Sequence, residues 1–231
     1  DGRAEDIFGA TRVSGQLGAR LPLADAAPAP AAKGKSAASR GIFDLKAALK
    51  ADARALELAD MALSLESEGP PQLASGTARL DWAGLPDLKV ELASQWLDLD
   101  RIGGHEAAGP LPPVLLRLAR GLAATLPETG RTTTTVRLEQ ATLGGDVVSG
   151  LEAIVERGED GRMRLGRLGA SLPGSSRIEV RGALSPETDD AIFDGEISLR
   201  GASLARFAAW ADRTRAVPDL RRDGAFAVSG R

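Results

Sequence analysis

The sequence predicts a mainly β fold with a few short helices, in the α+β class, built around a long antiparallel sheet. The first indication is a period-two alternation of apolar and charged residues, as in residues 88–92 (LKVEL), which places the apolar side chains on one face of a strand. The second is turn chemistry between such runs, as in Gly144-Gly145-Asp146 and Pro173-Gly174. The third is that only two runs carry a clear apolar stripe at helical spacing.

The composition narrows the possible functions. The 231 residues contain 29 Lys and Arg and 32 Asp and Glu, a net charge of −3, which argues against a nucleic-acid-binding protein. Cysteine is absent and there is a single histidine, which excludes disulfides, thiolate zinc sites and cysteine nucleophiles. We therefore expect a non-enzymatic protein with no cofactor, no metal site and no catalytic residues.

Residues 43–66 fit either a helix or two strands, and we favour two strands. Phe43, Leu45 and Leu49 alternate with polar or small residues, and a second alternating run ends at Leu65. The phase of the second run slips by one residue at Ala59-Asp60. Such a slip predicts an irregularity within the second strand.

Two helices and one loop complete the expected elements. Pro112-Pro113 precedes an apolar stripe over Val114–Leu126, and Ser203 is a suitable N-cap for a helix over Leu204–Asp212. Residues 24–41 consist largely of Ala, Pro, Lys, Gly and Ser without a large apolar side chain until the next strand. This segment is therefore predicted to be a flexible, solvated loop.

A strand–turn–strand–helix pattern occurs twice. Val90, Leu92 and Leu97 align with Ile197, Leu199 and Leu204 at an offset of 107 residues. The predicted organisation is entering strands in residues 1–23, the loop in 24–41, a first module in 42–130, a second in 131–217, and the start of a further strand in 218–231. We expect an internal fragment of a longer chain.

The polar motifs are predicted to be structural. His105 lies in a run of small residues and has no second histidine to complete a metal site, so we expect a solvent-exposed loop residue. Asp98 and Asp100 are expected to cap the short turn before Arg101 and to stay solvated. Core packing is the favoured role of the three tryptophans, Trp82, Trp96 and Trp210.

Two helices of about 14 and 10 residues cannot cover an apolar sheet face that is roughly 50 to 60 Å long, as a dozen strands would make it. The uncovered part either folds back as a β-sandwich or remains an open trough. Periodicity alone favours the sandwich.

Strand and turn signatures over residues 43–231 resemble the AsmA family. They comprise Gly144-Gly145, Ser149-Gly150-Leu151, 161–168, 172–182 (LPGSSRIEVRG), 193–199 (FDGEISL) and Leu204, Phe207 and Trp210, with Trp82, Leu92 and 97–100 (LDLD) resembling a preceding module. The resemblance implies a long, curved, open sheet with an apolar inner trough and flanking helices. It also implies a periplasmic location in a Gram-negative envelope, with inner-membrane anchoring by a transmembrane helix outside this fragment.

The AsmA family is related to the bridge-like lipid transfer proteins, and its members are regarded as lipid conduits. The resemblance therefore implies that this chain holds or conducts phospholipid acyl chains between the inner and outer membrane. The alternative is a closed structural or interaction scaffold that assists outer-membrane assembly through envelope protein partners. Alternation selects twelve residues as candidate lining of the lipid groove: Leu80, Val90, Leu92, Val136, Leu138, Leu151, Val155, Leu165, Ile178, Val180, Ile197 and Leu199.

Overall fold

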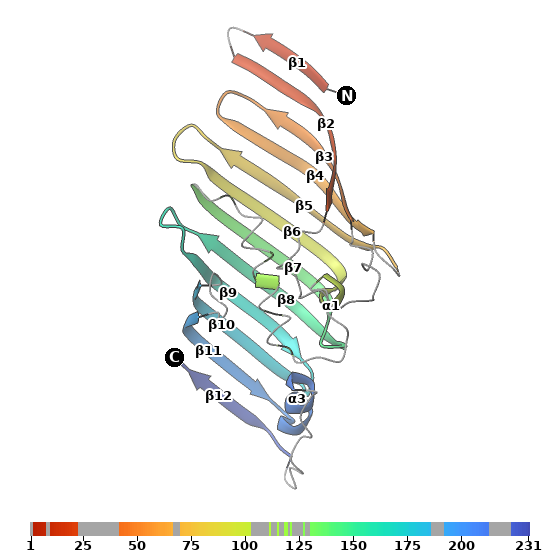
Figure 1. The fold of residues 1–231 in the computed structure, drawn as a ribbon, viewed down its shortest axis with the longest axis vertical. Coiled ribbons are helices and arrows are strands. Elements are labelled where there is room, and N and C mark those ends of the chain that lie inside the picture. The colour runs from red at the N-terminus through yellow and green to blue at the C-terminus, as the bar shows by residue number, and fades with distance from the viewer. Residues whose placement is uncertain are drawn as a thin grey trace, which may run out of the picture.

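The computed structural model describes residues 2–7, 10–22, 42–66, 70–102, 111, 115, 118–119, 121, 127, 130–185, 192–212 and 223–231. Within these ranges the chain is mainly β, and its strands form one open, unclosed sheet of twelve strands in which each pairs with its neighbours in sequence (Figure 1). The strands are β1 (Gly2–Ile7), β2 (Ala10–Pro22), β3 (Ile42–Ala51), β4 (Ala55–Glu66), β5 (Gln72–Asp81), β6 (Asp87–Asp98), β7 (Arg131–Leu143), β8 (Asp146–Arg157), β9 (Met163–Leu172), β10 (Ser176–Ser185), β11 (Ile192–Gly201) and β12 (Phe226–Gly230).

The sheet is antiparallel except at its centre, where β6 and β7 run parallel. This is a correction to the fully antiparallel sheet that the turn signals predicted. Parallel neighbours require the chain to return to the starting end of the strand, which takes a connection of a dozen residues or more. Residues 103–130 supply that length, and Arg131 enters β7 by donating its backbone N–H to the Pro86 carbonyl at 2.7 Å.

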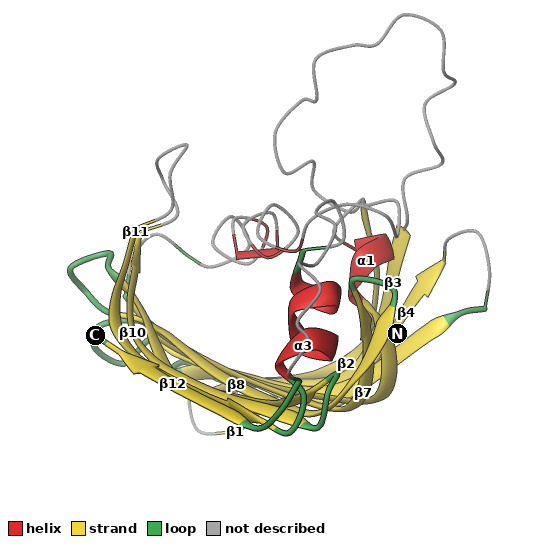
Figure 2. Ribbon diagram, turned by 90° about the horizontal axis from the view of Figure 1, so that it is seen from below, coloured by secondary structure: helices red, strands yellow, loops and turns green. Residues whose placement is uncertain are grey.

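The strands bend, so the sheet is concave on the side that carries the helices (Figure 2). Irregularities in pairing account for bends of this kind, because an extra residue on one strand kinks it. The register shifts between Leu58 and Met61 in β4 and between Val180 and Gly182 in β10. Asp60 has a positive φ of 51°, and Gly150 in β8 has a φ of 58°.

Two helices lie within the described residues, α1 (Leu99–Ile102) and α3 (Leu204–Ala211). Both begin where a strand ends, at the same rim of the sheet, which we call the helix rim. The main core cluster joins α3 to the sheet through Trp210, Leu143, Val148 and Ala170, together with Leu111. Further buried apolar residues, Ala47, Met61 and Leu65, lie on β3 and β4.

The two strands favoured for residues 43–66 are confirmed as β3 and β4, and the phase slip at Ala59-Asp60 coincides with the irregularity there. The helix expected from Ser203 is confirmed, with the Ser203 side chain accepting the Arg206 N–H. The loop over residues 24–41 and most of the helix over 114–126 lie outside the described residues. The described strands form a single sheet, so the sandwich that periodicity alone favoured is not observed.

The two halves of the sequence repeat differ after their helices. After α1 the chain returns to the opposite rim and enters the parallel strand β7. After α3 it enters β12, which pairs antiparallel with β11. A shared alternation in β6 and β11 therefore leads to two different continuations.

Candidate functional site: the apolar face of the sheet

Apolar residues lie opposite one another from strand to strand, so they form continuous rows across the sheet. Residues directly paired in a ladder share one face. One row follows the register from Leu92 to Ile197 and contains Leu92, Val136, Ala153, Leu168, Val180 and Ile197. A second row runs over the N-terminal strands and contains Val13, Ala51, Leu56, Leu80 and Leu88. We call the surface that carries these rows the apolar face.

The pairing places all twelve candidate lining residues on the apolar face. Val90 lies level with Thr134, which pairs with Val155, and Val155 pairs with Leu165. Leu138 pairs with Leu151, and Ile178 pairs with Leu199. These four residues belong to the apolar face because each alternates along its strand with a residue of the first row. Sequence alternation was therefore sufficient to select one surface, although it gave no strand order.

The helices pack on the same face. Leu151 and Ile178 contact the cluster built around Trp210, so two of the candidate lining residues lie under or beside α3. Val155 and Leu165 instead pack against buried Met163. An eight-residue helix is about 12 Å long, whereas twelve strands at about 4.8 Å spacing extend about 53 Å. Much of the apolar face therefore extends beyond the reach of α1 and α3.

The apolar face is most open towards its two ends. Val13 in β2 is 38% exposed, Ile197 in β11 is 40% exposed and Val228 in β12 is 60% exposed. The central residues Leu138 and Val155 are buried. Aliphatic side chains that face water in this way leave apolar surface available for contact with another molecule.

The opposite face is charged and hydrated. Arg137 on β7 lies between Glu91 on β6 and Glu152 on β8, at 3.7 Å from each, and Glu152 also lies 3.8 Å from Arg167 on β9. These side chains are all more than a third exposed, so each pair contributes little to stability. Their effect is to keep this face in water, since burying such a row against a second sheet would leave charges desolvated.

Both helices are anchored at the β7–β8 turn. The buried carboxylate of Asp100 in α1 accepts the backbone N–H groups of Gly144 at 2.8 Å and Gly145 at 2.7 Å. The Trp210 indole in α3 donates to the Leu143 carbonyl at 2.9 Å. Gly144 and Gly145 both have positive φ, as the two central residues of a tight hairpin require. The turn thus fixes the position of both helices on the apolar face.

The burial of Asp100 contradicts the prediction made for it from the sequence. We expected both aspartates to stay solvated, and Asp98 does cap the turn by accepting the Arg101 N–H at 3.0 Å. Asp100, however, is only 4% exposed, because the turn that it binds comes from a strand 44 residues away in sequence. Local sequence carries no sign of such a contact.

The three tryptophans differ in burial, and Trp96 is half-buried. Trp210 is 6% exposed and confirms the prediction of core packing. Trp82 is 38% exposed, so that prediction was wrong for this residue. Its indole nevertheless donates to the Ala53 carbonyl at 2.9 Å, which holds the ring against the neighbouring turn. His105 lies outside the described residues.

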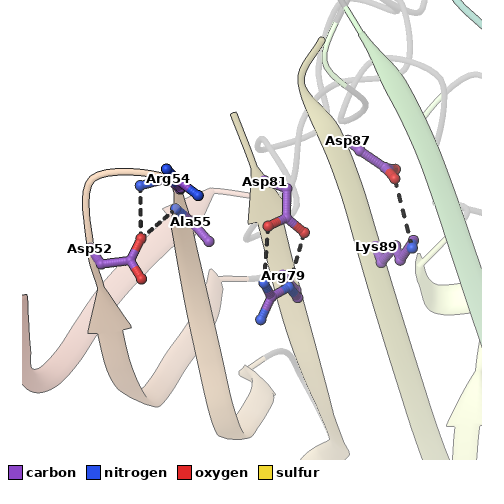
Figure 3. A network of polar contacts seen from close by, with 7 residues as sticks. All are labelled: Asp52, Arg54, Ala55, Arg79, Asp81, Asp87 and Lys89. Carbon is purple, nitrogen blue, oxygen red and sulfur yellow. Dashed lines mark hydrogen bonds and ion pairs between the residues drawn. The ribbon is translucent and has the colours of Figure 1, made fainter. Parts of the chain in front are cut away.

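Polar contacts stabilise the turns at the rim opposite the helices (Figure 3). Asp52 accepts the backbone N–H groups of Arg54 at 2.7 Å and Ala55 at 2.9 Å, and these bonds lower the pKa of Asp52. A hollow of about 360 Å³ beside this turn is lined by charged side chains including Arg12, Lys50 and Arg79. Val13, Ala51 and Ala55 line it as well.

Arg79 and Asp81 form a bidentate pair at this rim, with both bonds at 2.9 Å. The hydrogen bonds from Arg79 lower the pKa of Asp81, and Asp81 in turn raises the pKa of Arg79. On the next strand, β6, the Lys89 ammonium lies 3.7 Å from the carboxylate of Asp87. These are exposed, mutually neutralising pairs, so we assign them to turn and strand stability.

Arg157 is a residue of the apolar face that the sequence analysis did not select. It pairs with Thr132 on β7 and with Met163 on β9, which places it at the rim opposite the helices. The signal was present, because Arg157 continues the alternation of Leu151, Ala153 and Val155.

Within the described ranges, no three His, Asp or Glu side chains gather in a way that could hold a metal ion. Across the same residues, no helix combines the length and apolarity that crossing a bilayer demands.

Comparison with known proteins finds no matching family model, no matching curated protein and no matching solved structure. Function is therefore inferred from the two faces of the sheet.

Proposed function

We propose that this chain is a non-enzymatic, periplasmic segment of an AsmA-like protein that holds or conducts phospholipid acyl chains between the inner and outer membrane. In this proposal the concave sheet is a trough, flanked by α1 and α3, and acyl chains lie along its apolar face. The observation that carries the proposal is the row of paired aliphatic residues that continues from strand to strand and ends at exposed Ile197.

The chemistry of this face suits hydrocarbon. Burial of apolar surface is non-directional, so an acyl chain can exchange one Leu or Val contact for another without losing a specific bond. Each methylene removed from water contributes about 0.8 kcal/mol, so contact along about seven methylenes contributes about 6 kcal/mol, between millimolar and micromolar affinity. Binding of that strength permits both holding and release.

The charged face supports the same interpretation. The row from Glu91 through Arg137 and Glu152 to Arg167 stays hydrated, so the sheet has one surface for water and one for hydrocarbon.

Adjacent residues on one strand give a matched test, because they point to opposite faces. Ile197 and Ser198 are both exposed neighbours on β11. Ile197→Glu removes contacts worth about two methylenes and so weakens binding of a fluorescent fatty acid about tenfold or more, whereas Ser198→Glu leaves it unchanged. Val13→Glu and Ser14→Glu repeat the comparison at the other end of the sheet. Val180 is unsuitable, because it is 8% exposed and a charge there disrupts folding whatever the function.

The measurement uses protein purified from bacterial cells, with co-purified lipid identified by mass spectrometry and binding measured by titration. Circular dichroism confirms that each variant keeps its strand content. Equal lipid binding by the Ile197 and Ser198 variants would contradict the proposal and would leave the interaction scaffold as the better account.

A further inference from the structure

The β5–β6 turn (residues 82–86, WAGLP) exposes apolar side chains at the rim opposite the helices (Figure 1). Leu85 is 66% exposed and Trp82 is 38% exposed, and Ala83 and Gly84 between them are exposed as well. The turn contains no charged residue. Large apolar side chains that gather at one exposed point mark a contact site for another molecule.

The other two turns that the structure describes at this rim are charged. Residues 52–54 (DAR) connect β3 to β4, and residues 158–162 (GEDGR) connect β8 to β9. Hairpin connections depend on residues such as Gly, Pro, Asn and Asp, which supply the required backbone angles. The geometry of the β5–β6 turn therefore does not call for an exposed leucine at position 85, and its presence there points to a role outside the fold.

Hydrogen bonds hold both ends of the β5–β6 turn in place. Trp82 donates its backbone N–H to the Arg54 carbonyl at 2.8 Å and its indole N–H to the Ala53 carbonyl at 2.9 Å. At the other end, the Pro86 carbonyl accepts the Arg131 N–H at 2.7 Å. The indole nitrogen is the only polar atom of the ring, so with this bond made the ring offers carbon alone to a partner. A site that is ordered in advance loses less conformational entropy on binding.

The charges around the β5–β6 turn are compatible with an anionic surface. The flanking carboxylates of Asp81 and Asp87 are paired with Arg79 and Lys89 (Figure 3), so they do not leave the turn with an excess of negative charge. Arg54 is exposed, and its guanidinium forms no ion pair within the part of the chain that the structure describes. A cation beside an exposed apolar turn can meet lipid phosphate while the apolar side chains enter the membrane interface.

We propose that the β5–β6 turn docks on the surface of a lipid bilayer, with Trp82 and Leu85 in the interfacial layer and Arg54 at the lipid phosphates. A stable protein–protein interface buries about 800 Å² on each partner, which a turn of this size cannot supply. A bilayer accepts a single apolar turn because lipids rearrange around it, and tryptophan favours the interfacial layer. The inference goes beyond the proposed function, since docking does not require the apolar face to hold acyl chains.

Co-sedimentation of the chain with vesicles tests the proposal. The vesicles contain phosphatidylcholine with about 25% phosphatidylglycerol, and the wild-type chain is expected to pellet with them. Leu85→Asp places a charge in the interfacial layer and weakens partitioning about fivefold or more. The matched control is Leu73→Asp, which changes a leucine that is 61% exposed at the other end of β5 and leaves partitioning unchanged. Both leucines are exposed, so both variants fold.

Two further variants separate the parts of the turn. Arg54→Gln is expected to weaken binding to the vesicles that contain phosphatidylglycerol about threefold and to leave binding to pure phosphatidylcholine unchanged. Trp82→Phe keeps an apolar ring and is expected to pellet as the wild-type chain does. Brominated phosphatidylcholine is expected to quench the tryptophan fluorescence of the wild-type chain but not that of Trp82→Phe, because Trp210 is buried and Trp96 lies at the far end of β6.

A wild-type chain that does not pellet with vesicles overturns the proposal. So does equal binding by Leu85→Asp and Leu73→Asp, because the contact then lies on another surface. A dimer that forms without lipid in sedimentation velocity and that Leu85→Asp abolishes, in a chain that does not pellet, places a second copy on the turn instead. None of these results depends on the fatty-acid titration that compares Ile197→Glu with Ser198→Glu, so failure here is distinguishable from failure of the proposed function.

Discussion

Replacement of Trp210 by alanine tests how the helices are held on the apolar face. Trp210 is 6% exposed, packs with Leu143, Val148 and Ala170, and donates its indole N–H to the Leu143 carbonyl at 2.9 Å. Loss of a buried aromatic ring of this size costs about 4 kcal/mol. With a urea m-value of about 2 kcal/mol/M, the unfolding midpoint falls by about 2 M.

Two further variants separate the contributions. Trp210→Phe keeps most of the ring but removes the hydrogen bond, and costs about 1 to 2 kcal/mol because the Leu143 carbonyl loses its donor. Trp82 provides a matched control, since its indole also donates to a backbone carbonyl at 2.9 Å but the residue is 38% exposed. Trp82→Ala is therefore expected to cost about 1 kcal/mol.

The assay is urea unfolding followed by circular dichroism, combined with amide exchange of α3. The Trp210 variants are expected to increase exchange at the Asp212 N–H, which donates to the Ala208 carbonyl at 3.0 Å. Equal destabilisation by Trp210→Ala and Trp82→Ala would refute the reasoning, because burial would then not determine the cost. Unchanged exchange in α3 would show that Trp210 does not anchor the helix.

Three other predictions concern the turns and caps. Asp100→Asn replaces an acceptor by a donor facing the Gly145 N–H and lowers the free energy of unfolding by about 2 kcal/mol, whereas Asp98→Asn costs about 1 kcal/mol or less in the same urea experiment. Gly150→Ala lowers the free energy of unfolding by about 1 kcal/mol, and the cause is the positive φ alone, because the added Cβ meets no atom within 4 Å. Gly18→Ala is the neutral control, since an added Cβ also meets no atom there and the residue has no positive φ. The pKa of Asp223 is lowered because the Ser203 hydroxyl and the Ala205 N–H bind its ionised form. The contribution of Asp223 to stability is therefore full above the ordinary aspartate pKa. It is lost as pH falls through the lower pKa of the folded state, below about pH 4. NMR exchange at the Ala205 N–H measures this loss, and Asp223→Asn is expected to remove the pH dependence.

Much of the sheet was predictable because its signal is local. Alternation depends only on side chains pointing to opposite faces in turn, so it identified β3 and β4, the slip at Asp60 and the shared face of the twelve candidate residues. The N-cap Ser203 is local as well, since it bonds within the first turn of α3. These features need no knowledge of which strands are neighbours.

The features that could not be predicted depend on distant contacts. The parallel pairing of β6 and β7 follows from the path of a long connection rather than from either strand. Burial of Asp100 requires the β7–β8 turn, and the contact of Trp82 with the Ala53 carbonyl requires the turn between β3 and β4. Arg157 is different, because its place on the apolar face follows from alternation and was missed.

The most direct test of acyl-chain binding on the apolar face is site-specific photocrosslinking along β11. A photoreactive residue is placed in turn at 196, 197, 198 and 199, and crosslinking to radiolabelled phospholipid is measured. Yields are predicted to alternate, high at 197 and 199 and low at 196 and 198, in step with the pleat of the strand. Uniform or negligible yields at all four positions would contradict the account.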